Sequence, residues 1–111
     1  MPGKEKNIQT ALDGIDGEIV GIVGDFVKRR KEHYEQLAKK LQENLKKDVK
    51  RYAVMLADEK ISAADFELLS KGRWAQIQIE LLSEASISKR KFEGISNEIL
   101  RRTIKAVFEV V

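Results

Sequence analysis

The stretch that decides the fold is YEQLAKKLQENLKKDVKRYAVML, residues 34–56. The six steps between its first and last apolar positions cover 22 residues, about 3.7 residues per step, which is close to the period of an α-helix. Charged and amide side chains fill most of the positions between them, so the pattern predicts a helix with one apolar stripe and a polar remainder. The stripe consists of Tyr34, Leu37, Leu41, Leu45, Val49, Tyr52 and Leu56.

The apolar spacing extends towards the N-terminus through Ile19, Ile22 and Phe26, with Arg30 filling one gap. It predicts a single helix over residues 17–58, which at 1.5 Å per residue would be about 60 Å long. We expect residues 1–16 to form a flexible or irregular N-terminal lead-in, which ends in residue types that are typical of a turn. Residues 15–27 also fit a strand or an irregular segment, because glycine recurs there among Ile and Val, and these alternatives stay open.

The second element begins after a short turn. Ser62 and Asp65 have the spacing of a capping box, and Ile61 with Phe66 has the spacing of a hydrophobic staple, so a helix should start at residue 63. We expect this helix over residues 63–86 and a third over 89–111 with Ser88 as its N-cap, although one bent helix over 63–111 is the alternative. The short turn predicts antiparallel packing of the first two helices.

The predicted fold is all-α: a long N-terminal helix, an antiparallel returning arm of one or two helices, and a single domain over residues 17–111. Apolar side chains cover most of the girth of helix 63–86, which we therefore expect to be the central element. Because one partner helix cannot cover that surface, we expect oligomerisation, most simply a dimer, to complete the bundle. The candidate packing residues are Gly17, Gly21, Gly24, Phe66, Trp74, Ile77, Leu81, Phe92, Ile99 and Phe108.

The glycines in that set follow Gly14 at spacings of three and four residues, and so share one helix face. Each interior glycine costs a helix about 1 kcal/mol against alanine. Close approach of a second helix would offset this cost, which is why the pattern favours a helix–helix contact there.

The composition argues against most enzymes. The 111 residues include no Cys and one His, so thiol chemistry, disulfides and most histidine chemistry are excluded. Residues 54–65 align with an EF-hand calcium loop only by placing Val54 and Leu56 at ligand positions, where neither offers a side-chain oxygen. We therefore expect no enzymatic activity, no cofactor and no metal.

The charge is distributed in blocks. Net charge is +3 overall, but residues 28–51 carry +6 and residues 89–111 carry +3, while residues 1–27 and 52–88 each carry −3. A basic stripe on the first helix is a possible nucleic-acid contact, although acidic residues spaced for ion pairs on the same helix favour an ordinary solvated face. The candidate contacts are Lys28, Lys31, Lys39, Lys46 and Lys50.

Together these patterns predict a non-enzymatic assembly or adaptor protein that self-associates and presents helical surfaces to a protein partner. A nucleic-acid-associated protein using residues 28–51 is the alternative, and a peripheral membrane protein is the second. No apolar run of signal-peptide or membrane-spanning length occurs in the sequence, so we expect a cytoplasmic location by default.

Overall fold

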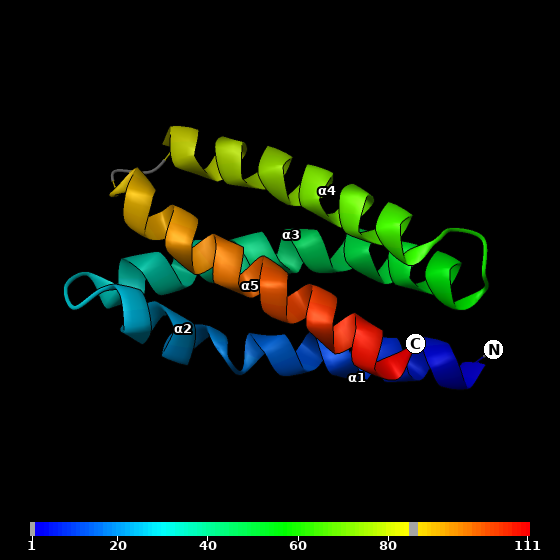
Figure 1. Ribbon diagram of the computed structural model, residues 1–111. Helices are drawn as coiled ribbons and strands as arrows, with labels where there is room; N and C mark the ends of the chain where they lie inside the picture. Colours follow the sequence, from blue (N-terminus) through cyan, green and yellow to red (C-terminus); the bar gives the residue numbers. More distant parts are fainter. Residues whose placement is uncertain (1, 85–86) are drawn as a thin grey trace.

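The computed structural model describes residues 2–84 and 87–111, and in these ranges the chain forms helices and no strand (Figure 1). The prediction of an all-α fold is confirmed. The helices are α1 (Pro2–Asp16), α2 (Ile19–Phe26), α3 (Lys31–Ala57), α4 (Ala63–Glu84) and α5 (Lys89–Val110).

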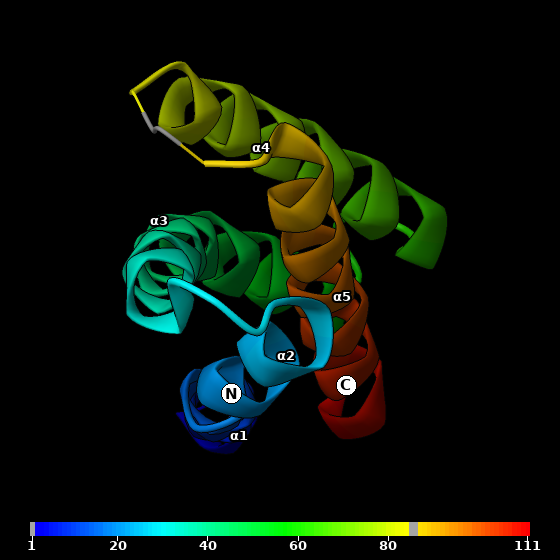
Figure 2. The same cartoon turned by 90° about the vertical axis from the view of Figure 1, so that its left-hand side faces the viewer.

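The helices form an elongated bundle of 44 × 23 × 17 Å. Helices α3 and α4 pack antiparallel across the turn that joins them, as the sequence predicts (Figure 1). Seen from one end, α3 and α5 lie side by side, with α4 on one side of this pair and α1 with α2 on the other (Figure 2). Helices α3 and α5 each contact all four of the other helices, so this pair is the centre of the bundle, whereas α4 packs only on α3 and α5 in the described chain. The prediction that residues 63–86 would be central is wrong.

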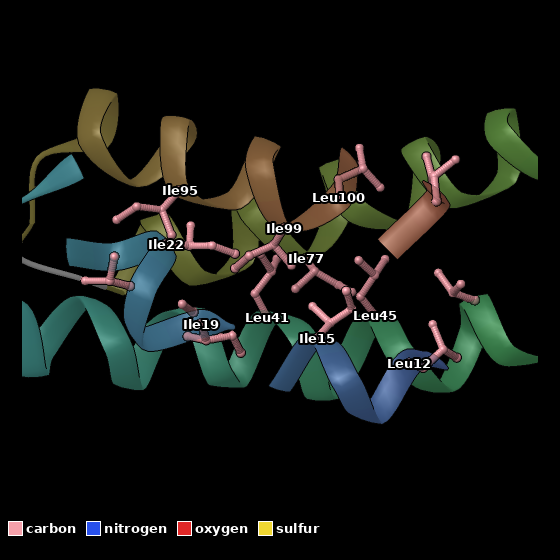
Figure 3. Packing of buried hydrophobic residues seen from close by; sticks show 14 of the residues in the cluster. Leu12, Ile15, Ile19, Ile22, Leu41, Leu45, Ile77, Ile95, Ile99 and Leu100 are labelled. Atoms are coloured by element: carbon pink, nitrogen blue, oxygen red, sulfur yellow. The ribbon is translucent and has the colours of Figure 1, made fainter. Parts of the chain in front are cut away.

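The core fills the space between α1, α2, α3 and α5 (Figure 3), and α4 packs on α3 and α5. Its apolar side chains come from all five helices, so one chain builds a continuous core without a second copy. Its largest fully buried apolar members are Phe66, Phe92, Ile8, Leu12, Ile19, Ile22, Leu41, Leu45, Ile77, Ile95 and Ile99.

The N-terminal segment is part of this core, which corrects the expectation of a flexible or irregular lead-in over residues 1–16. Ile8, Leu12 and Ile15 are buried, and their spacings of four and three place them on one face of α1. That face packs against α3 and α5. Burial of this apolar face therefore orders a segment whose other positions are mostly polar.

The predicted single helix over residues 17–58 is also wrong, because the chain breaks between α2 and α3. Val27 is extended and buried, and Arg30 adopts the left-handed conformation with φ 58°. The break turns α2 back beside α3, so Ile19, Ile22 and Val23 are buried in the core. In a single straight helix, these three residues would lie away from the core. The 15–27 segment is thus mainly helical, not a strand.

Backbone caps fix the turn from α3 to α4. Lys60 N–H donates to Met55 O and Glu59 N–H to Leu56 O, the pair of bonds of a Schellman motif, with Glu59 at φ 60° in the position that glycine usually takes. The predicted capping box is confirmed, since Asp65 N–H donates to Ser62 Oγ and Ser62 N–H to Asp65 Oδ2, each at 3.1 Å.

Two helices, not one bent helix, follow this turn. Ser88 is extended and its Oγ accepts from Lys91 N–H, which confirms the predicted N-cap of α5. The structure describes α4 to residue 84, and the predicted helix end at residue 86 lies outside the described residues.

Candidate interaction surface

Helix α4 is apolar on two opposite faces, and only one of them packs against the other described helices. Its inner face buries Phe66, Ile77 and Leu81. On the opposite face Leu68 is 73% exposed and Ile79 is 70% exposed, and both are large apolar side chains. Exposing them to water forgoes about 1.5–3 kcal/mol each relative to full burial.

The outward face of α4 has small residues at its middle. Gly72 and Ala75 lie between Leu68 and Ile79 at spacings of four, three and four, so these side chains share one stripe of the helix. Nothing lies within 4 Å of the position that a Cβ on Gly72 would take. We call Leu68, Gly72, Ala75 and Ile79 the α4 outer face; it contains no charged residue.

Polar contacts fix which side of α4 points inward. Trp74 Nε1–H donates to Ser96 O at 2.9 Å, and Ser96 Oγ donates to Gln78 Oε1 at 2.8 Å. The Ser70 hydroxyl is buried on the same side and has no partner among the described residues. The helix thus buries polar groups and exposes Leu68 and Ile79. In an isolated bundle, apolar side chains are usually buried and polar ones exposed.

Five of the predicted packing residues lie inside this one chain and pack its own helices together. Trp74 is half-buried against α5, and the Phe108 ring lies 5.6 Å from that of Phe66 with part of its edge exposed. The buried five are Phe66, Ile77, Leu81, Phe92 and Ile99.

The predicted glycine contact does not form within the chain. Gly17, Gly21 and Gly24 are exposed, and a Cβ added to Gly21 or Gly24 would meet nothing within 4 Å. A different glycine, Gly94 on α5, is closely approached by another helix: the Phe26 ring lies where its Cβ would be. Gly94 is isolated in the sequence, so spacing offered no signal for it.

The predicted basic stripe is divided by ion pairs to α1. The Lys46 ammonium contacts the carboxylates of Asp13 and Asp16, the second at 2.9 Å, and Lys50 Nζ lies 3.9 Å from Glu5 Oε1. Burial acts to lower the pKa of Lys46, but its hydrogen bonds to the two aspartates outweigh this and raise it. The hydrogen bond from Lys46 lowers the pKa of Asp13.

The remaining three residues of the predicted stripe, Lys28, Lys31 and Lys39, are exposed. The structure therefore does not bring the five lysines together on one free surface. Lys46 and Lys50 instead help to hold α1 against α3.

A second charged cluster joins α5 to the start of α2. Glu98 accepts from Arg101 and Arg102, and Arg102 Nη1 also donates to Glu18 Oε1 at 2.7 Å. These hydrogen bonds lower the pKa of Glu98 to about 2. The cluster links elements that lie 84 positions apart in the sequence.

Among the described residues, no three His, Cys, Asp or Glu side chains gather where they could hold a metal ion. No described helix combines the length and the apolar character needed to cross a membrane. Compared with protein-family models, with curated proteins and with solved structures, the chain matches none.

Proposed function

We propose that this chain is a non-enzymatic helical assembly module that self-associates through the α4 outer face and presents its remaining helical surfaces to a protein partner. The observation that carries the proposal is the exposure of Leu68 at 73% and Ile79 at 70% on one uncharged stripe. A stripe of this kind on a helix that already packs its other side fits a second helix.

A second copy is the occupant that the stripe fits best, because its pattern is self-complementary. In an antiparallel pair of α4 helices, Leu68 of one copy would lie opposite Ile79 of the other, and Gly72 opposite Ala75. Large side chains would then meet at both ends of the contact and small ones at its centre, where the backbones can approach closely. Such an isologous contact closes as a two-fold dimer.

The contact would be modest in size. Four large apolar side chains, two from each copy, would contribute roughly 6–12 kcal/mol on burial, against an association cost of about 4–15 kcal/mol. The surface of a single helix is also smaller than the roughly 800 Å² per partner of a standard interface. We therefore expect a reversible dimer with a Kd of about 1 μM to 1 mM.

Size-exclusion chromatography with light scattering tests the surface. Leu68→Lys should weaken dimerisation at least about tenfold, because it places a charge at both symmetry-related ends of the contact. Val20→Lys is the matched control, since Val20 is 54% exposed but lies on α2, on the other side of the bundle. Loss of the dimer in the Val20 variant alone would assign the contact to α2 and overturn the proposal.

Cysteine cross-linking tests the antiparallel geometry, because the natural chain has no Cys. Ala75→Cys should form a disulfide with its own copy, since residue 75 lies near the two-fold axis. Leu68→Cys should cross-link to an Ile79→Cys chain and not to itself. Self-cross-linking of Leu68→Cys would show a parallel pair instead.

A further inference from the structure

The fold brings two basic segments together at one end of the bundle (Figure 1). The segment 28–31 lies between Phe26, whose ring contacts the Gly94 position, and Tyr34, whose hydroxyl accepts from Ser88 N–H at 3.1 Å. Both ends of the α2–α3 connection are therefore attached to the first turns of α5. Segment 89–91, which forms the first turn of α5, lies at the same end of the bundle.

Positive charge is concentrated at this end, although 57 residues of the sequence lie between the two segments. Residues 28–31 and 89–91 are seven bases with no acid among them, whereas the whole chain has a net charge of only +3. All seven are exposed, and we call six of them, all except Arg30, the basic end. They are Lys28, Arg29, Lys31, Lys89, Arg90 and Lys91.

Elsewhere in the described chain, many bases already have acidic partners. Lys46, Arg73 and Arg102 each contact a carboxylate within 3 Å, so their charge is locally neutralised. None of the six side chains of the basic end makes an ion pair with the described residues. In addition, α3 and α5 both begin at this end, and helix N-termini add positive potential.

We propose that the basic end binds the sugar–phosphate backbone of a nucleic acid without reading its sequence. Lysine and arginine side chains that lack local partners gain most from contacts with a row of phosphates, because binding releases the counterions of the nucleic acid. The two segments contain no apolar side chain that could insert into a lipid surface and strengthen binding there. The chemistry therefore favours a nucleic acid over a membrane.

This surface differs from the stripe that the sequence suggested. It omits Lys39, and it omits Lys46 and Lys50, which form ion pairs with α1. It adds Arg29 and three residues of α5. It is also separate from the α4 outer face, so the two proposals can fail independently.

Fluorescence anisotropy with a labelled 20-base-pair DNA duplex, over 50–200 mM salt, tests the proposal. If six bases contact phosphates, the slope of log K against log salt should be about −5. The double variant Lys89→Glu with Lys91→Glu should lose at least about tenfold in affinity and reduce the slope by about 2. The matched control, Lys39→Glu with Lys40→Glu, makes the same change in charge at exposed positions of α3 away from this end, and should lose less than about threefold.

Circular dichroism should show that both double variants keep the helical fold, since all four lysines are exposed. If the two double variants lose the same affinity for DNA, binding depends on the overall charge of the chain and not on the basic end, and the proposal is overturned. So would the absence of duplex binding by the natural chain at 50 mM salt, or sedimentation with phosphatidylserine vesicles in place of DNA binding.

Discussion

The Phe26 ring occupies the space that a side chain on Gly94 would need: a Cβ there would lie 2.6 Å from Phe26 Cε1 and 2.9 Å from Cδ1. This contact joins the end of α2 to α5 at the point where the chain leaves α2 for α3. Packing against this ring therefore favours glycine at position 94, inside α5, although glycine costs a helix about 1 kcal/mol relative to alanine.

The first prediction compares two helix-interior glycines. Gly72→Ala should stabilise the chain by up to about 1 kcal/mol, because nothing lies within 4 Å of its Cβ position. Gly94→Ala should gain less or lose stability, because the Phe26 ring must move. Urea unfolding of the two variants, at concentrations where the chain is monomeric, measures the difference.

A double-mutant cycle identifies the cause of that difference. In a Phe26→Ala background, Gly94→Ala should recover the full stabilisation expected for a helix-interior glycine. If Gly94→Ala has the same effect with and without the Phe26 ring, the contact does not explain this glycine.

The left-handed residue at the end of α3 gives a second prediction. Glu59 has φ 60°, which costs about 1–2 kcal/mol for a residue with a Cβ, so Glu59→Gly should raise the free energy of unfolding by about 1 kcal/mol. Asp58 has φ −84°, and Asp58→Gly should give no gain. A gain at residue 58 and none at residue 59 would contradict the Schellman assignment.

The third prediction concerns α1. Leu12 is fully buried, so Leu12→Ala should reduce the free energy of unfolding by about 2–5 kcal/mol. Thr10 is exposed on the same helix, and Thr10→Ala should change it by less than about 0.5 kcal/mol. If the two substitutions have equal and small effects, α1 is not docked on the core.

The depressed pKa of Glu98, about 2, gives a fourth prediction. The ordinary value is 4.5, so the folded state favours the charged form, and the stabilisation is complete above about pH 4.5 and is lost as the pH falls towards 2. Glu98→Gln should therefore destabilise the chain at pH 7, by an amount on the order of 1–2 kcal/mol after solvent screening. The difference from the natural chain should shrink below pH 4.5.

Thermal unfolding between pH 2.5 and pH 7 measures this convergence. Glu93→Gln is the control on the same helix, because the exposed Glu93 side chain makes no ion pair with the described residues. A difference between the Glu98 variant and the natural chain that stays constant across this range would rule out the arginine pairing as its source.

The sequence predicted the local features of the fold well. The caps at Ser62 and Ser88 depend on residues within three positions of each other, and both form as expected. The apolar spacing of Ile8, Leu12 and Ile15 was also readable, and it could have identified α1.

The features that depend on distant residues could not be predicted. The break near Arg30 contains no proline or glycine, and it is compatible with the fold because α2 gains packing against α3 and α5. In the same way, the pairing of Lys46 with Asp13 requires α1 to lie beside α3, which helical periodicity alone does not specify. The candidate surfaces on α4 and at the basic end both follow from this tertiary arrangement.

Sedimentation equilibrium of the unaltered chain, from about 1 μM to 1 mM, tests the central claim most directly. The exposed pair Leu68 and Ile79 predicts a reversible monomer–dimer equilibrium whose midpoint lies within this range. A single monomeric mass at every concentration would contradict self-association through the α4 outer face.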